Sequence, residues 1–407
     1  MSILKSVYHF CLAIFGAIIY RFPSKKLIVI GVTGTKGKSS TTEMINAIFE
    51  EAGKKTAVLN SIRIKVDSES VPNTMRMSMP GRFFIESFLA RAVGARVEVA
   101  ILEMTSEGAR QHRHRGISLD ALVFTNLAPE HIESHGSFEA YADAKFKIGR
   151  QLARSRKKYR VIVANADDPQ SARYLALPVE RQLPFSIKHD KSRSADEKGG
   201  HFMFNDTTIY LHMPGEFSLS NALAAATLAD AFGIATPVIA RALGKISRIP
   251  GRAEKIIAGQ DFDVVVDYAH TADSLQALYD AYANVRKICV LGSTGGGRDK
   301  WKRPVMGKVA HDNCDVVILT NEDPYDEDPR TIIDEIAAEM KSKTEIIIDR
   351  RMAIARGISL AREGDAVLIT GKGTDPTIQG PNHSSIPWSD VQVAREEIEK
   401  ALHKKTI

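Results

Sequence analysis

The sequence predicts an α/β protein in which mainly parallel sheets are covered by helices. Short apolar runs rich in β-branched residues recur along the chain, and segments of helix length separate them. This alternation is typical of βαβ units, which place their strands in parallel sheets. Two domains are expected, because 407 residues exceed the usual size of one domain and 44% of them are hydrophobic.

The expected strands are short and several end at a polar residue or glycine. They cover residues 97–102, 121–127, 160–164, 264–267, 288–291, 316–320, 345–348 and 366–370. The residues at or just after their ends include Glu103, Asn126, Asn165, Asp267, Ser293, Asn321 and Gly371. Ligands of open α/β sheets bind at the carboxyl ends of strands, so functional residues are expected there.

Two connecting segments stand out between these elements. Residues 188–200 are polar and lack apolar periodicity, which predicts a flexible surface loop. A domain boundary is expected near 247–250, where a helix-like stretch ends at Pro250 and a new series of strands follows.

Residues 7–20 are almost wholly apolar and are flanked by basic residues, Lys5 before them and three more by position 26. A helix of this length spans about 21 Å, short of the roughly 30 Å core of a bilayer. Three hypotheses stay open for the segment 1–26: a helix at a membrane surface, a helix packed on the protein or a partner, and an export signal. Export is the least favoured, because no small-residue cleavage site precedes Arg21.

The stretch from Gly31 to Ser40 lies between an apolar run and a helix-like segment at 41–52. Backbone N–H groups of such a turn, together with the helix N-terminus, bind phosphate; its lysine reaches the outer phosphates and the following hydroxyl can ligate Mg²⁺. The spacing is shorter than the standard phosphate loop, which has glycine where Val32 stands. The expected nucleotide-binding residues are Gly34, Thr35, Lys36, Gly37, Lys38, Ser39 and Ser40.

Two later clusters carry groups suited to the same chemistry. Glu103 follows an apolar strand, and its carboxylate could share a Mg²⁺ with Ser39 and phosphate oxygens. The other cluster begins at the strand-end residue Asn126 and continues through His131 to Lys145.

Composition disfavours several other classes of function. The net charge is +6 and the pI near 9.0, yet no basic stripe interleaved with aromatic residues is present, so no nucleic-acid partner is expected. Three widely spaced cysteines without a Cys-x-x-Cys pair predict neither a disulfide framework nor a zinc site. A reducing cytoplasm fits this usage.

The phosphate-loop, Glu103 and Asn126–Lys145 segments together resemble the Mur ligase family, ATP-dependent enzymes that join an amino acid to a peptidoglycan precursor. Within the family they are most similar to the tripeptide synthetases. Further matching stretches are 165–169, 214–221, 251–254, 267–275, 298–300 and 371–373. The resemblance implies a P-loop-containing central ATP-binding domain at 27–247, with a mainly parallel sheet, and a Rossmann-like α/β C-terminal domain at 248–407 that receives the amino acid.

The family's chemistry implies roles for the residues of the central domain. The acceptor carboxylate takes the γ-phosphoryl group of ATP to give an acyl phosphate and ADP, and the amine then displaces phosphate. Lys38 is expected to contact the β- and γ-phosphates, Ser39 and Glu103 to hold one Mg²⁺, and His131 to ligate a second. Lys145 matches a lysine that CO₂ carbamylates in these enzymes, which turns a cation into an anion that orients the metal site.

Three more residues match positions around the nucleotide. Asn221 matches a residue near the adenine, Arg252 one that faces the phosphates, and Asp267 one on the ribose side. The last two belong to the C-terminal domain, which is expected to close over the nucleotide and exclude water from the acyl phosphate.

The sequence departs from the tripeptide synthetases at its beginning. About 26 residues precede the apolar run at 27–30, where the first strand is expected, whereas those enzymes usually carry a UDP-binding domain before it. Three hypotheses stay open: a separate UDP-binding partner, an acceptor held by the central domain alone, and an acceptor that is not a UDP-sugar, such as a lipid-linked one at the membrane.

The expected amino-acid pocket departs as well. Glu322-Asp323-Pro324-Tyr325 stands where diaminopimelate-adding members have Asp-Asn-Pro-Arg, and Thr374-Asp375 stands where His-Glu is common. Tyrosine cannot replace an arginine fork on a carboxylate, so diaminopimelate is disfavoured, while lysine or another diamino acid stays open. The expected contacts with the amino acid are Asp323, Tyr325, Gly371 and Asp375.

Two alternatives to a peptidoglycan-precursor ligase stay open. The first is another ligase of the superfamily, such as a folylpolyglutamate or cyanophycin synthetase. The second is a partner-dependent ATP-binding subunit without catalytic activity, which the retained phosphate and metal positions disfavour. The favoured interpretation is a cytoplasmic ATP- and Mg²⁺-dependent amide ligase, membrane-associated if residues 7–20 lie on a bilayer.

Overall fold

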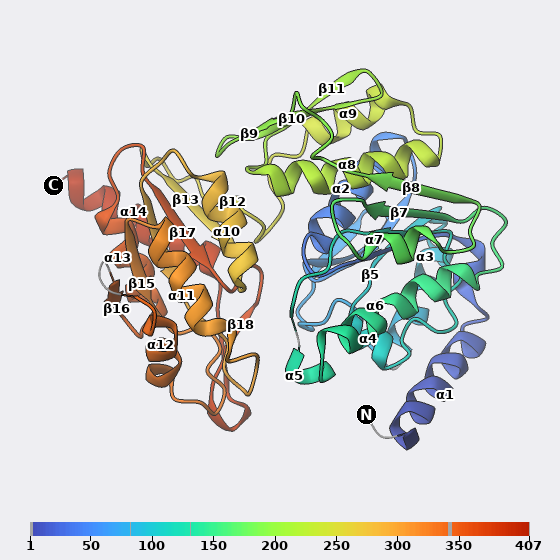
Figure 1. Cartoon of the computed structure of the whole chain (residues 1–407), viewed down its shortest axis with the longest axis horizontal. Helices are drawn as coiled ribbons and strands as arrows, with labels where there is room; N and C mark the ends of the chain where they lie inside the picture. Colours follow the sequence, from blue (N-terminus) through green and yellow to red (C-terminus); the bar gives the residue numbers. More distant parts are fainter. Residues whose placement is uncertain (1–2, 82, 131, 341–343, 407) are drawn as a thin grey trace. The chain divides into compact units, whose positions relative to one another are not determined.

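The computed structural model describes residues 3–81, 83–130, 132–340 and 344–406 (Figure 1). The chain divides into two compact α/β units. Unit 1 comprises Met1–Ser194, Gly199–His212 and Glu216–Ser247, and unit 2 comprises Ala195–Lys198, Met213–Gly215 and Arg248–Ile407. Both units confirm the predicted fold class.

Over its described residues, unit 1 is built on an eight-stranded sheet with the strand order β4-β3-β2-β5-β1-β6-β7-β8. The six strands β2, β5, β1, β6, β7 and β8 are adjacent in that order and run parallel. Strands β3 and β4 extend the sheet beyond β2 as antiparallel strands. The strands are β1 (Ile28–Thr33), β2 (Thr56–Leu59), β3 (Arg63–Val66), β4 (Glu69–Pro72), β5 (Val99–Glu103), β6 (Ala121–Phe124), β7 (Val161–Asn165) and β8 (Arg181–Phe185).

Helices cover both faces of this sheet, as its continuous apolar strands require. They are α1 (Ile3–Ile19), α2 (Lys38–Glu51), α3 (Phe84–Gly94), α4 (Ser106–Arg110), α5 (Ile132–His135), α6 (Phe138–Ala153), α7 (Ser171–Leu175), α8 (Glu216–Ala231) and α9 (Thr236–Gly244), with a 3-10 turn, η1 (Pro23–Lys26). A small sheet of β9 (Ser194–Ala195), β10 (Gly200–Phe204) and β11 (Thr207–Leu211) lies beside α8 and α9.

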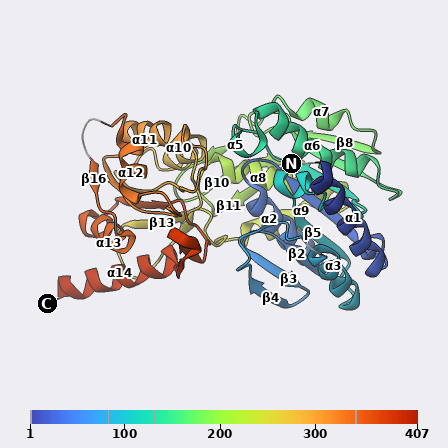
Figure 2. The same ribbon diagram turned by 90° about the horizontal axis from the view of Figure 1, so that it is seen from below.

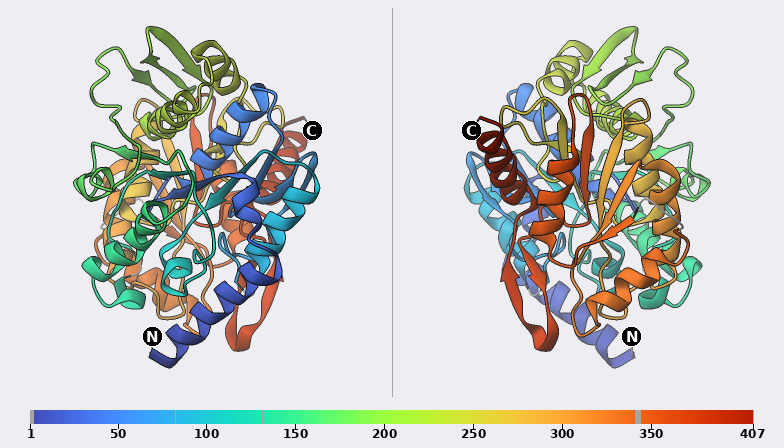
Figure 3. Two further views of the ribbon diagram at one scale, coloured as in Figure 1. Left: turned by 90° about the vertical axis from the view of Figure 1, so that its right-hand side faces the viewer. Right: turned by 90° about the vertical axis from the view of Figure 1, so that its left-hand side faces the viewer.

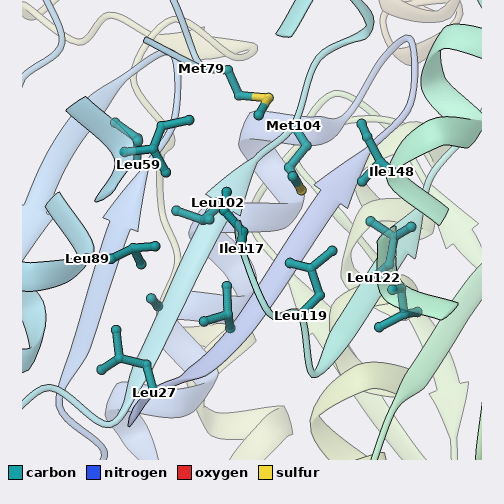
Figure 4. Packing of buried hydrophobic residues seen from close by; sticks show 14 of the residues in the cluster. Leu27, Leu59, Met79, Leu89, Leu102, Met104, Ile117, Leu119, Leu122 and Ile148 are labelled. Carbon is teal, nitrogen blue, oxygen red and sulfur yellow. The ribbon is translucent and has the colours of Figure 1, made fainter. Parts of the chain in front are cut away.

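The main core of unit 1 lies between the sheet and α3, α6 and α7 (Figure 4). Alternate strand residues such as Leu102 and Leu122 meet Leu89 of α3 and Ile148 of α6 in one cluster. Residues of the opposite parity, such as Val32, are equally buried, and α2 and α8 pack against one another and against the strands. The central strands β1 and β5 are therefore held rigidly where they end, next to the phosphate loop.

Within the described ranges, unit 2 contains a six-stranded sheet with the order β12-β13-β17-β14-β15-β16, parallel except for the β12–β13 pair. Its strands are β12 (Glu254–Lys255), β13 (Asp263–Asp267), β14 (Lys287–Leu291), β15 (Val316–Leu319), β16 (Thr344–Ile346) and β17 (Ala366–Thr370). Its helices are α10 (Ala272–Ala281), α11 (Lys302–Asn313), α12 (Pro329–Ala337), α13 (Arg350–Leu360) and α14 (Asp390–Thr406). A hairpin of β18 (Thr377–Gln379) and β19 (Ser385–Pro387), with the 3-10 turn η2 (Pro381–His383), completes the unit.

The predicted strands all exist, with bounds that differ by a few residues. The predicted strand 121–127 ends early, at Phe124, because residues 125–127 turn towards the phosphate loop. The loop predicted at 188–200 contains the two-residue strand β9 and the first residue of β10. The antiparallel pair β3 and β4 was not predicted from the sequence.

One prediction about cysteine is wrong. Cys289 in β14 and Cys314 just before β15 form a disulfide, with their Cα atoms 6.2 Å apart. Twenty-five positions separate them in the sequence, but the parallel pairing of β14 and β15 brings them together. Cys11 is free and exposed.

Helix α1 begins earlier than the predicted helical segment at residue 7 and packs on unit 1 through one face only. Ala17 is fully buried, whereas Leu4 is 84% exposed. No helix in the described part of the chain has both the length and the hydropathy of a membrane span.

Candidate functional site

The turn after β1 has the backbone shape of a phosphate cradle. Gly34 has φ of 152° and Gly37, the N-cap of α2, has φ of 78°, a region that favours glycine. A Cβ added at Gly37 would lie 2.2 Å from Oδ1 of Asn221, and one at Gly34 would lie 1.9 Å from Oγ1 of Thr125. Both positions therefore require glycine, and the turn is shaped by neighbouring elements as well as by its own sequence.

Ser39 and Glu103 meet at the carboxyl ends of β1 and β5. The Ser39 hydroxyl donates to Oε2 of Glu103 at 2.8 Å, and the carboxylate is 3% exposed. Oε2 also accepts from the backbone N–H of Ser61 at 3.0 Å, and Oε1 accepts from the hydroxyl of Ser78 at 2.8 Å. The structure thus brings together the two residues predicted to hold Mg²⁺.

Ser61 and Ser78 are site residues that the sequence analysis missed. The Ser61 hydroxyl lies 2.9 Å from that of Ser39, so it belongs to the same polar cluster. Ser61 lies two residues after the end of β2, a strand that the sequence analysis did not predict, and Ser78 lies outside the strands. Only the way in which the chain folds over Glu103 reveals them.

Residues after β6 hold the phosphate loop from the other side. The Lys36 N–H donates to Oδ1 of Asn126 at 2.9 Å, and Oγ1 of Thr125 donates to the Lys36 carbonyl at 2.6 Å. The Lys36 ammonium pairs with the buried carboxylate of Glu130 at 3.2 Å. Lys38 Nζ donates to the carbonyl of Thr35 at 2.9 Å, so it folds back over the turn.

Lys145 is buried in α6 beside the same turn. Its ammonium is 2% exposed, donates to the carbonyl of Gly34 at 2.6 Å and lies 4.8 Å from the centre of the Tyr141 ring. Burial, and secondly the positive charge of Lys38, hold the pKa of Lys145 well below its ordinary value. Its amine is therefore easier to deprotonate than that of an exposed lysine.

The remaining unit 1 predictions fall around this centre. Asn221, on α8, accepts from Oγ1 of Thr41 at 3.3 Å and packs against Gly37. The Thr35 hydroxyl lies 3.1 Å from that of Tyr141, and Ser40 is buried at the start of α2. His131 lies outside the described residues.

Two predicted nucleotide contacts, Arg252 and Asp267, belong to unit 2 and lie close together there. Asp267 ends β13 and accepts from the backbone N–H groups of Ala253 and Ala269, each at 2.6 Å. The Arg252 guanidinium lies 4.7 Å from the centre of the Tyr268 ring and donates to the carbonyl of Gly251 at 3.0 Å. Asp267 thereby fixes the turn that carries Arg252.

The four predicted amino-acid contacts lie at the carboxyl ends of β15 and β17 in unit 2. Lys372 Nζ bridges Oδ1 of Asp323 at 2.8 Å and Oδ2 of Asp375 at 3.1 Å, and its side chain is 1% exposed. Gly371, with φ of 107°, leaves room for Glu322, whose Oε2 would lie 2.5 Å from a Cβ there. Tyr325 has φ of 52°, and its ring packs on Gly296 and lies 5.9 Å from the guanidinium of Arg298.

The fold and the first of these sites define a nucleotide-dependent α/β enzyme of the P-loop class. Its cradle, its basic side chains and its buried Ser39–Glu103 pair are suited to a nucleoside triphosphate with Mg²⁺. Residues 32–229 match the Mur ligase middle domain, and residues 251–373 match the Mur ligase, glutamate ligase domain. The chain belongs to the Mur ligase family, whose members are ATP-dependent ligases that form amide bonds.

Curated relatives agree with this membership. The chain is 36% identical, over 401 residues, to UDP-N-acetylmuramoyl-L-alanyl-D-glutamate--2,6-diaminopimelate ligase of Syntrophomonas wolfei, an alignment that covers 95% of this chain and 81% of that protein. It is 34% identical to UDP-N-acetylmuramyl-tripeptide synthetase of a Roseiflexus strain, with 95% and 81% covered.

Solved structures show the same fold. A UDP-N-acetylmuramoyl-L-alanyl-D-glutamate--2,6-diaminopimelate ligase structure superimposes with a TM-score of 0.63 at 27% identity, covering 93% of this chain and 79% of that one. Mycobacterium tuberculosis folylpolyglutamate synthase, solved with ADP and AMPPCP, gives 0.72 at 17% identity, covering 90% and 93%. At that identity the second match shows the fold alone.

Proposed function

We propose that this chain adds an amino acid to a UDP-N-acetylmuramoyl dipeptide, and that the Ser39–Glu103 pair under the phosphate loop is the centre of its ATP site. The named relatives act on this class of acceptor, and the 2.8 Å contact between Ser39 and Glu103 is the observation that carries the assignment. The acceptor carboxylate attacks the γ-phosphorus, ADP leaves, and the amine nitrogen of the amino acid then displaces phosphate from the acyl carbon.

The residues at this site fit Mg²⁺. Magnesium prefers oxygen ligands, keeps several waters, and is usually held by one or two carboxylates together with substrate phosphates. Glu103 supplies a buried carboxylate and Ser39 a hydroxyl, while Ser61 and Ser78 fix the carboxylate by hydrogen bonds. When bound, the ion would neutralise phosphate charge. His131 is proposed as the ligand of a second ion.

The same proposal gives Lys145 a covalent role. A neutral amine reacts with CO₂ to form a carbamate and release one proton, and the lowered pKa of Lys145 favours the neutral amine. The carbamate would place a negative charge near Lys36 and Lys38, the two cations that help to lower the pKa of Lys145. Lys38 is proposed to contact the β- and γ-phosphates.

In unit 2, Asp323, Tyr325, Gly371 and Asp375 are proposed to receive the amino acid, and Arg252 and Asp267 to contact the nucleotide, as Asn221 does from unit 1. The domains are proposed to span 27–247 and 248–407. Because Tyr325 stands in place of the arginine of diaminopimelate-adding ligases, lysine or another diamino acid is proposed as the substrate. We further propose that the enzyme works in the cytoplasm with residues 7–20 in contact with a membrane.

Phosphate release from ATP tests the proposal. The full chain is supplied with Mg²⁺ and bicarbonate, the UDP-linked dipeptide or a lipid-linked dipeptide, and a panel that contains lysine, ornithine and diaminopimelate. We expect release only when an acceptor and one amino acid are both present, and none from Lys38→Ala. Turnover of the UDP-linked acceptor by the chain alone would exclude a required UDP-binding partner. ATP binding without release for any pair would favour a non-catalytic subunit.

A further inference from the structure

Helix α1 presents a continuous apolar stripe on its exposed face, one edge of which, at Tyr8 and Phe15, also reaches Phe83 of unit 1. Its members follow one another at intervals of three or four positions, which places them on one side of a helix. Six of them are between 50% and 84% exposed, and the seventh, Cys11, is also exposed. The stripe consists of Leu4, Val7, Tyr8, Cys11, Phe15, Ile18 and Ile19.

The opposite face of α1 is held on unit 1, so the stripe is not a displaced core face. Ser6 Oγ lies 2.8 Å from Nε2 of His112, Gly16 abuts the ring of Phe83, and Ala17 is fully buried. Figures 2 and 3 show α1 on the outside of unit 1. An exposed apolar surface of this kind marks an interaction site.

The charged residues of the N-terminal segment itself are all of one sign. No aspartate or glutamate occurs before Glu43, while Lys5 lies on α1 and Arg21, Lys25 and Lys26 follow it. These four basic residues are exposed. The acidic group nearest to the stripe, Glu86, is buried in the cavity that Tyr8 helps to line. An apolar stripe on a segment whose exposed charges are cations complements the surface of an anionic bilayer, where apolar side chains enter the acyl region and the cations remain among the head groups.

We propose that α1 docks lengthwise on an anionic lipid bilayer through this stripe while its other face stays on unit 1. A 17-residue helix is about 25 Å long, enough to lie in the interface but not to cross the hydrocarbon core. The inference rests on the proposed membrane contact of residues 7–20 and adds the face, the orientation and the lipid class. It brings unit 1 to the membrane surface.

Cys11 makes the proposal directly testable, because the other two cysteines form a disulfide. The full chain is labelled at Cys11 with an environment-sensitive fluorophore and mixed with vesicles of phosphatidylcholine alone or with 30 mol% phosphatidylglycerol, the latter composition being about that of an anionic membrane. We expect a blue shift and co-flotation with anionic vesicles, loss of both in high salt, and quenching by shallow rather than deep spin labels. The matched control carries Cys11→Ser and a label at Tyr210→Cys, on the exposed face of β11.

The double variant Phe15→Ser/Ile18→Ser should reduce vesicle binding at least tenfold, whereas Ile257→Ser, a 76% exposed residue of unit 2, should leave it unchanged. Circular dichroism and sedimentation velocity establish that each variant is folded and report its oligomeric state. Equal binding to neutral and anionic vesicles, quenching by deep labels, or a dimer that hides the Cys11 label without binding vesicles would each overturn the proposal. Vesicle binding requires no turnover, so this failure is distinguishable from failure of the ligase assay.

Discussion

The most deeply buried lysine in the described part of each unit lies beside its candidate site, and the two lysines have opposite surroundings. Lys145 in unit 1 donates to a backbone carbonyl and lies over an aromatic ring. Lys372 in unit 2 is held between the carboxylates of Asp323 and Asp375. A buried cation held between carboxylates braces the structure, whereas burial beside neutral groups lowers the pKa of an amine.

These different surroundings imply different roles for Lys145 and Lys372. Burial and Lys38 lower the pKa of Lys145, which prepares its amine for reaction. Lys372 fixes two of the residues proposed to receive the amino acid. Removing the first should damage chemistry, and removing the second should damage stability.

The largest effect is expected at Lys145. Lys145→Ala should lower turnover about a thousandfold, because the site loses the anion that the carbamate supplies. Short carboxylic acids such as acetate or propionate should restore part of the rate, and wild-type activity should fall when CO₂ and bicarbonate are removed. Phosphate release measures all three.

Lys147→Ala, two positions further along α6, is the matched control and should remain within about twofold of wild type. Full activity of Lys145→Ala, or wild-type activity that does not depend on CO₂, would contradict the assignment.

Lys145→Met should unfold at no lower urea concentration than wild type at neutral pH. In wild type, stability should rise with pH above the lowered folded pKa of Lys145, since the unfolded chain binds more protons there, and the Met variant should lack this slope.

Lys372→Met is expected to lose stability, whereas the Lys145 variants are expected to lose activity. It leaves the carboxylate of Asp323, 4% exposed, without its cation, and should cost about 3–5 kcal/mol of unfolding free energy in urea titrations. Adding Asp323→Asn should recover part of the loss. Lys308→Met, which breaks an exposed pair with Asp312, should leave the unfolding free energy almost unchanged, because water screens that pair. A similarly small cost at Lys372 would remove the contrast between the units.

How far the sequence predicted these sites depends on how local each signal is. The phosphate loop and Glu103 were predictable, because a glycine turn and a strand-end carboxylate are visible over a few residues. Ser61 and Ser78 were not, and although Asp323 and Asp375 were predicted as site residues, their ion pairs with Lys372 were not, since these depend on how distant segments fold together. The Cys289–Cys314 pair was missed for the same reason, because only the alignment of β14 with β15 reveals it.

Glu86 in unit 1 is a buried acidic residue, in contrast to the buried lysines Lys145 and Lys372. Its carboxyl group has no hydrogen-bond partner among the described residues. It lies on α3 near Ala17 of α1, and burial raises its pKa to about 7 from 4.5. The folded state then binds more protons than the unfolded state between pH 4.5 and 7, so stability should fall across that window as pH rises. The shift corresponds to about 3 kcal/mol.

Urea titrations at pH 5 and pH 8 test this expectation. Glu86→Gln should flatten most of the pH dependence, whereas Glu399→Gln, an exposed residue of α14, should retain it. An unchanged slope in Glu86→Gln would mean that Glu86 is ionised throughout, with water reaching it from the cavity that Tyr8, Leu12 and Phe83 help to line.

The smallest effect is expected at Ser78, where the loss of one neutral donor leaves the site otherwise intact. Glu103 would still accept from Ser39 at 2.8 Å and from the Ser61 N–H at 3.0 Å, so Ser78→Ala should raise the Mg²⁺ concentration for half-maximal turnover only a few-fold, about 1 kcal/mol. Ser359→Ala, on the exposed part of α13, is the control. A change in maximal rate at saturating Mg²⁺, with no change in Mg²⁺ requirement, would instead place Ser78 against the acceptor. The anion proposed at Lys145 should govern rate, and the hydrogen bonds around Glu103 should govern metal affinity, so the two variants separate the two functions of unit 1.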